Sequence, residues 1–144
     1  MREGWHASEG RPSLSEPRWL AVRAFRQGDV PAVRRFAQAF WTRAGIASAR
    51  LTDFVLAVSE ASACATAWGP CTARVRLWLA GNRAFCEVQG DGMLVRRAPD
   101  TGRAGGRPGE AEALRRLVLQ QVSDYVSVAS SPDGVRVILS MTVA

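Results

Sequence analysis

Two short turn sequences constrain the fold of this chain more than any other feature. Gly81-Asn82 separates the segments ARVRLWLA and RAFCEVQ, in which apolar and other residues alternate. Pro132-Asp133-Gly134 separates two similar runs within YVSVASSPDGVRVILSMTV. A period of two is typical of strands that bury one face, and Gly, Asn and Asp favour tight turns. The sequence therefore predicts two antiparallel hairpins.

Three other segments have the spacing of helices that bury one face. The first is preceded by Asp29, a suitable N-cap, and followed by Gly45, which ends a helix. The same reasoning bounds the other two helices by turn-forming residues. We expect helices between Asp29 and Gly45, from near Ser48 to about Gly69-Pro70, and from about Glu110 to Gln121, after a first strand at residues 18–25.

The order of these elements indicates the fold class. Strands that come in hairpins, with helices able to cover one face, predict an α+β fold, a two-layer α/β sandwich with a mixed, mostly antiparallel sheet and its helices on one face. Residues 90–109 are rich in Gly, Pro and Arg and are expected to form a long loop. Residues 1–16 lack periodicity and are expected to be a disordered arm, so a single domain spans 17–144.

Composition narrows the class of protein. Of the 144 residues, 47% are hydrophobic and 22% are charged, as in soluble globular proteins. The chain has no apolar run of the ~18 residues that a membrane span needs, and its first residues lack an apolar signal segment. We therefore expect no membrane insertion and a cytoplasmic location. Cys64, Cys71 and Cys86 form an odd set without CxxC spacing, which favours buried thiols over disulfides or a zinc site.

The net charge of +6 comes from arginine, because the chain contains no lysine. A positive charge favours either nucleic acid or an acidic protein as a partner. The arginines are spread along the chain, and no basic stripe with interleaved aromatic residues is present. Binding to nucleic acid is therefore the less favoured of the two.

The stretch LTDFVLAVSEASACATAWG carries a family resemblance. It fits a helix with the frame E-x-x-x-(N)-A-x-x-(H), in which Glu60, Cys64 and Trp68 take the three marked places. With the order of elements and the long loop before the third helix, it resembles the GHKL ATP-binding fold. More narrowly, the chain is similar to the bacterial anti-sigma-factor serine/threonine kinases, over roughly residues 18–144. The segment LVLQQVSDYVSVASSPDGVRVILSM is similar to the helix–Asp–strand–turn–strand ending of that family.

The resemblance implies roles for this helix. Glu60 takes the place of the general base, Cys64 replaces an asparagine that ligates Mg²⁺, and Trp68 replaces a common histidine. Residues four and eight apart lie along one helix face. A thiol is a poor ligand for Mg²⁺, which prefers oxygen. Glu60 is thus either a catalytic base or a solvated or locally paired glutamate, and Cys64 is either a reactive thiol or a structural one.

The adenine-binding motif of the family, Asp-x-Gly, falls on GDG after the first hairpin. Gly90 takes the place of the aspartate that accepts a hydrogen bond from adenine, Asp91 lies between, and Gly92 is the retained glycine. A one-residue bulge would bring Asp91 into the role of the aspartate.

The phosphate-binding motif of the family, G-L-G-L, falls on Ala113 to Arg116. Only Leu114 is retained there. Two alternatives stay open in the preceding loop. One is a shifted phosphate loop at Gly105, Gly106 and Gly109, and the other is an anion held by Arg96, Arg97, Arg103 and Arg107.

These departures affect the metal, the adenine and the phosphates together. The sequence therefore favours a regulatory protein-binding module that resembles anti-sigma-factor kinases but lacks a cofactor; ATP with Mg²⁺ is expected only if the site is retained. The partner would be a sigma factor, an anti-sigma antagonist or a related kinase. An active serine/threonine kinase and a basic nucleic-acid-binding regulator are the alternatives. The resemblance also implies a homodimer, for which a patch is available at Trp19, Phe36, Phe40 and Trp41.

Overall fold

The computed structural model describes residues 18–67, 71–91 and 108–143. The expected N-terminal arm, Trp68, Gly92 and most of the long loop lie outside the described residues. The order of the described elements is the one that the sequence predicts. The elements are β1 (Arg18–Arg26), α2 (Val30–Arg43), α3 (Leu51–Ala65), β2 (Thr72–Ala80), β3 (Arg83–Gly90), α5 (Pro108–Val122), β4 (Tyr125–Ser131) and β5 (Gly134–Thr142).

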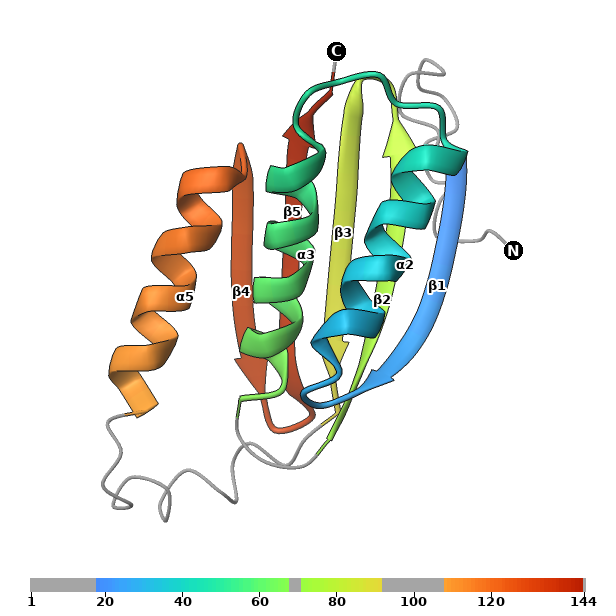
Figure 1. Ribbon diagram of the computed structural model, residues 1–144. Coiled ribbons are helices and arrows are strands. Elements are labelled where there is room, and N and C mark those ends of the chain that lie inside the picture. The colour runs from blue at the N-terminus through green and yellow to red at the C-terminus, as the bar shows by residue number, and fades with distance from the viewer. Residues whose placement is uncertain (1–17, 68–70, 92–107, 144) are drawn as a thin grey trace, which may run out of the picture.

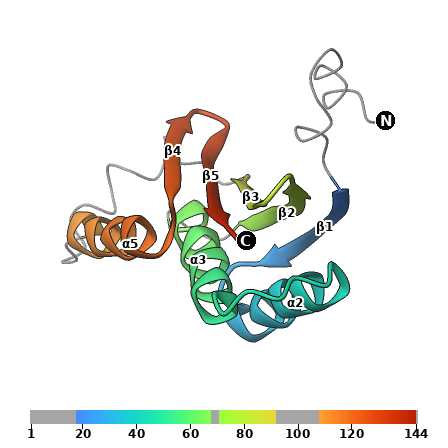
Figure 2. The ribbon, with the colours of Figure 1, turned by 90° about the horizontal axis from the view of Figure 1, so that it is seen from above.

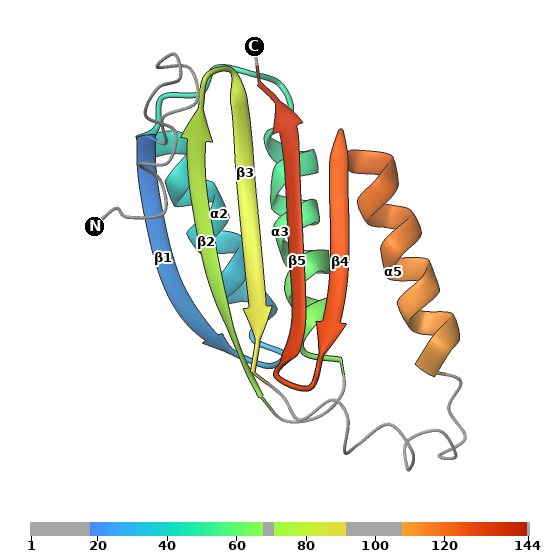
Figure 3. The ribbon, with the colours of Figure 1, turned by 180° about the vertical axis from the view of Figure 1, so that it is seen from behind.

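The strands form one five-stranded sheet in the order β1-β2-β3-β5-β4 (Figure 1). Every pairing in it is antiparallel. Seen from above, α2 and α3 lie on the same side of the sheet, and α5 lies beside α3 near β4 (Figure 2). The view from behind shows the other face of the strands with no described helix in front of it (Figure 3). The fold is therefore the expected two-layer α+β sandwich.

Local signals set most helix ends, with two shifts. Asp29 caps α2 as expected, since its carboxylate accepts a hydrogen bond from the Ala32 N–H. The next helix begins at Leu51 rather than near Ser48, because the Ser48 hydroxyl accepts a hydrogen bond from the Arg50 N–H and forms a turn. The same helix leaves helical geometry at Thr66, whose hydroxyl donates to the Ser62 carbonyl.

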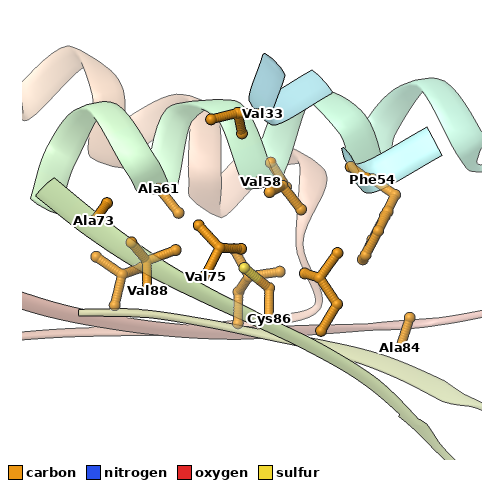
Figure 4. Packing of buried hydrophobic residues seen from close by; sticks show 14 of the residues in the cluster. Val33, Phe54, Val58, Ala61, Ala73, Val75, Ala84, Cys86 and Val88 are labelled. Carbon is orange, nitrogen blue, oxygen red and sulfur yellow. The ribbon is translucent and has the colours of Figure 1, made fainter. Parts of the chain in front are cut away.

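The core lies between α2, α3 and the inner face of the sheet. Val58 and Ala61 of α3 point toward Val75, Cys86 and Val88 of the central strands (Figure 4). These side chains are fully buried. Burying each aliphatic side chain of this kind contributes about 1.5–3 kcal/mol, so α3 is held mainly by apolar contact.

The patch expected at the first strand and helix is divided between core and surface. Phe40 and Trp41 are buried, and both rings pack on Phe54 of α3. Trp19 is 53% exposed and has a φ of 59° at a bulge in β1. Phe36, the third aromatic residue of α2, is half-buried and packs on Phe25. Phe40 and Trp41 are thus core residues, and Trp19 remains on the edge strand.

The C-terminal strands are tied to α3 by a clamp of Arg50 and Asp124. The Asp124 carboxylate accepts hydrogen bonds from the Thr142 N–H at 2.6 Å and from the Arg50 guanidinium at 3.2 Å. Arg50 also donates to the carbonyls of Val122 and Thr142. The Thr142 N–H is the main cause that lowers the pKa of Asp124 below its ordinary value of 3.8, and Arg50 adds to it.

We predict that Asp124→Ala lowers the free energy of unfolding by roughly 1 kcal/mol at neutral pH, since a partly exposed charge-assisted clamp is lost. The pKa of Asp124 is lower in the folded protein than the value of 3.8 in the unfolded chain. The stability that this difference provides is complete above pH 3.8 and is lost as the pH falls through the pKa of the folded protein. The parent protein should therefore lose more stability than the variant below about pH 4. Urea unfolding as a function of pH measures this, with the turn variant Asp133→Ala as control. Identical acid profiles for parent and Asp124→Ala would contradict it.

Candidate functional site

Glu60, the residue expected as a general base, forms an ion pair with α5. The Arg115 Nε lies 3.9 Å from the Glu60 Oε1, and the two side chains are 35% and 25% exposed. Arg115 takes the second glycine position of the phosphate motif that the resemblance implies. The structure thus fits a locally paired glutamate, and the pair itself contributes little to stability because water reaches it.

Cys64 lies one turn after Glu60, but its side chain belongs to the core. It is fully buried together with Ala61 and Ala65. A thiol enclosed by packed side chains is shielded from reagents and from ligands in solution, which fits a structural Cys64. For Cys86, burial raises the pKa of the thiol, and the nearby negative charge of Glu87 adds to that shift. Glu60 and Cys64 therefore face different surroundings although they are four residues apart.

Gly90 is buried at the end of β3, directly under the last turn of α3. A Cβ atom built on Gly90 would overlap the carbonyl oxygen of Ala65. Gly134 is close-packed in the same region, since a Cβ atom there would overlap the Gly90 carbonyl oxygen. A side chain at position 90 is therefore excluded by backbone atoms, which a change of rotamer cannot move.

Asp91 follows Gly90 and is bound to the start of β2. Its carboxylate accepts hydrogen bonds from the Thr72 N–H at 2.9 Å and from the Thr72 hydroxyl at 2.8 Å. These two bonds lower the pKa of Asp91. The β2–β3 pairing is in regular register through Gly90, so the described strands contain no bulge at this point. The structure places the Asp91 carboxylate on Thr72.

The remaining expected site residues are divided between α5 and segments outside the described residues. Leu114 is on α5 and 60% exposed. Because α5 begins at Pro108, Gly109 lies in its first turn. Gly92, Gly105, Gly106 and the loop arginines Arg96, Arg97, Arg103 and Arg107 lie outside the described residues.

A small polar groove that the sequence did not predict lies between the β1–α2 turn and α3. Its volume is about 290 Å³, and Gln27, Asp29, Ser59, Ser62, Thr66 and Arg115 contribute to its lining. Its polar groups are partly engaged within the fold, since the Gln27 amide donates to the Thr66 carbonyl at 2.6 Å. The volume is at the lower limit of the ~300–1,000 Å³ typical of ligand pockets. The signal in the sequence was the pair of serines, Ser59 and Ser62, which interrupt the apolar residues of α3.

Comparisons with known proteins give no family assignment. A scan against protein-family models and a search of curated proteins found no match to this chain. Within the described ranges, no three His, Cys, Asp or Glu side chains are grouped so that they could hold a metal ion. None of the described helices is both long and apolar enough to cross a membrane.

We predict that Gly90→Ala destabilises the protein by about 3 kcal/mol, the upper range for overpacking a core, because the new methyl group meets the Ala65 carbonyl. Gly90→Asp, which restores the residue that the resemblance implies, should be at least as severe. Gly45→Ala is the matched control. Position 45 has open space around it but a φ of 68°, so only a conformational cost of ~1 kcal/mol is expected. Thermal and urea unfolding measure all three. Equal stability of Gly90→Ala and the parent would refute the packing described.

A second prediction concerns the thiols. Cys71 is half-buried, whereas Cys64 and Cys86 are buried, so a thiol reagent should modify Cys71 first in the native protein. All three cysteines should react once the chain is unfolded in urea. Mass spectrometry after timed alkylation assigns each site. Modification of Cys64 in the native protein as fast as Cys71 would instead support a reactive thiol at that position.

Proposed function

We propose that this chain is a regulatory protein-binding module of the anti-sigma-factor kinase type that neither binds ATP productively nor transfers phosphate. The observation that carries the proposal is the contact of Gly90 with Ala65. The position that would read adenine has no side chain, and the backbone of α3 occupies the space in which one would start. Recognition of adenine needs a polar group there, because the base is otherwise not distinguished.

The state of the other two positions supports the same conclusion. Cys64 would have to supply a ligand for Mg²⁺, but it offers a soft thiol within the core, whereas Mg²⁺ requires accessible oxygen atoms. Glu60 would have to remove a proton, but its carboxylate is paired with Arg115. Phosphoryl transfer depends on positioning and on a metal that stabilises charge, and these residues supply neither.

The proposed module acts in the cytoplasm through a protein partner, either a sigma factor, an anti-sigma antagonist or a related kinase. The basis for naming these partners is the resemblance in the α3 stretch and in the C-terminal helix and hairpin. The kinase-like fold would then be retained as a scaffold for surfaces that bind protein, while its nucleotide site is closed by packing.

Calorimetric titration with ATP, with and without Mg²⁺, tests the proposal. We expect no saturable binding up to about 1 mM nucleotide, which corresponds to a binding free energy weaker than about −4 kcal/mol. We also expect Glu60→Ala to leave any trace phosphorylation of candidate proteins unchanged, since the parent has no activity to lose. Micromolar binding that requires Mg²⁺, or phosphorylation abolished by Glu60→Ala, would refute the proposal in favour of an active kinase.

A further inference from the structure

The face of the sheet that no described helix covers carries a cluster of arginines around one glutamate. We call Arg74, Arg76, Glu87, Gln89 and Arg136 the arginine cluster; they come from β2, β3 and β5 and line a shallow hollow of about 260 Å³. Those on β2 and β3 alternate with the buried Ala73, Val75 and Val88, so they lie on the sheet face opposite to α2 and α3. Three guanidinium groups and one carboxylate leave two positive charges in excess.

Strand register holds the cluster in a fixed arrangement. Arg74 and Arg136 both pair with Gln89, one from each side, so their Cα atoms are about 10 Å apart across two strand spacings. Glu87 lies two residues before Gln89 on β3. One of its carboxylate oxygens pairs with Arg76 at 3.2 Å, and the other pairs with Arg136 at 2.9 Å. Glu87 is only 16% exposed, whereas Arg136 is 50% exposed. The carboxylate thus lies beneath the arginines and orients them.

Arg74 is the cation of the cluster that is not held by Glu87 in this arrangement. Its partners across the strands are Ala24 and Gln89, neither of which carries a charge. Arg136 lies between Gln89 of β3 and Ala129 of β4. On the side away from Gln89, each of these two arginines therefore has an alanine as its neighbour. An incoming group can reach the planar guanidinium edges from there, and such edges bind carboxylates with two parallel hydrogen bonds.

An aromatic pair adjoins the cluster on the same face. Trp78 pairs with Phe85 across β2 and β3, one two-residue step from the Arg76–Glu87 pair. The ring centroids are 5.1 Å apart, and the ring planes are stacked at an angle of 2°. A two-residue step along a strand is about 7 Å. An apolar side chain can therefore contact this pair while a carboxylate one or two residues away reaches the arginines.

We propose that this face binds an acidic segment of a partner protein, with its carboxylates on Arg74 and Arg136 and an apolar side chain on the Trp78–Phe85 pair. The inference rests on the proposed function as a protein-binding module and names the chemistry of the partner. A second copy of the chain is disfavoured as the occupant, because a two-fold interface would bring two positively charged clusters together. Nucleic acid is disfavoured because the Trp78 and Phe85 rings stack on each other, so one face of each ring is already covered. Proteins that bind single strands stack bases on open ring faces.

The test uses the full chain and a fluorescein-labelled peptide rich in glutamate that contains leucine residues, with its glutamine counterpart as the uncharged probe. Fluorescence anisotropy should show binding of the glutamate peptide that weakens as salt is raised. Arg74→Glu should weaken it about tenfold, because one attractive contact becomes repulsive. Arg34→Glu on α2 makes the same change of charge on the helical side, where Arg34 is exposed, and should alter binding by less than about twofold.

Each outcome decides between occupants. Equal weakening by Arg74→Glu and Arg34→Glu would overturn the site, because the overall charge alone would then explain binding. No difference between the glutamate and glutamine peptides would overturn it too. Tighter binding of a DNA oligonucleotide that is sensitive to Arg74→Glu would assign the face to nucleic acid. A serine-for-leucine peptide that binds as well as the original would exclude the aromatic pair. None of these arms contains ATP or Mg²⁺, so failure here is distinct from failure of the ATP titration.

Discussion

The close approach of α3 to strands β3 and β5 is the contact on which the rest of the structure depends. It is possible because Gly90 and Gly134 have no side chains at the points where Ala65 and Gly90 present carbonyl oxygens. With its last turn seated there, α3 buries its apolar stripe on the sheet, and α2 and α5 both pack against α3 in turn. Protein interiors are packed as densely as organic crystals, so one additional methyl group at this contact would have to displace backbone.

This packing also determines what chemistry remains available. Two residues four apart on a helix differ by ~40° around its axis. That difference is enough to place one at the edge of the core and the other at its centre. Glu60 and Cys64 are an example, since the first is half-buried beside Arg115 and the second is fully buried. Shared helical spacing therefore did not place the two residues in one site. The tight contact at Gly90 and the burial of Cys64 both follow from the seating of α3 on the sheet.

Much of the fold could be predicted from the sequence because its signals are local. Asp29 caps its helix through its own carboxylate, and the turns at Gly81 and Gly134 join strands that alternate regularly. The helix ends at Leu51 and Ala65 depend on hydrogen bonds of Ser48 and Thr66 that compete with the helix, and spacing alone does not reveal them. The Glu60–Arg115 pair and the arginine cluster could not be predicted, because they join residues far apart in sequence. Alternation indicates that Arg74, Arg76 and Glu87 share a sheet face, but only the register of β5 adds Arg136.

A two-layer fold leaves one sheet face without a covering layer, and the character of that face then decides which partners fit. Here Glu87 fixes the directions of Arg76 and Arg136 before any ligand arrives. Binding usually costs free energy because long cationic side chains lose conformational freedom. For Arg76 and Arg136, much of this freedom is already lost on folding. In the proposed site Glu87 orients Arg136, whereas strand register sets the position of Arg74 opposite Gln89. Charge that is merely scattered over a surface attracts any anion, whereas charge fixed by strand register selects one with matching spacing.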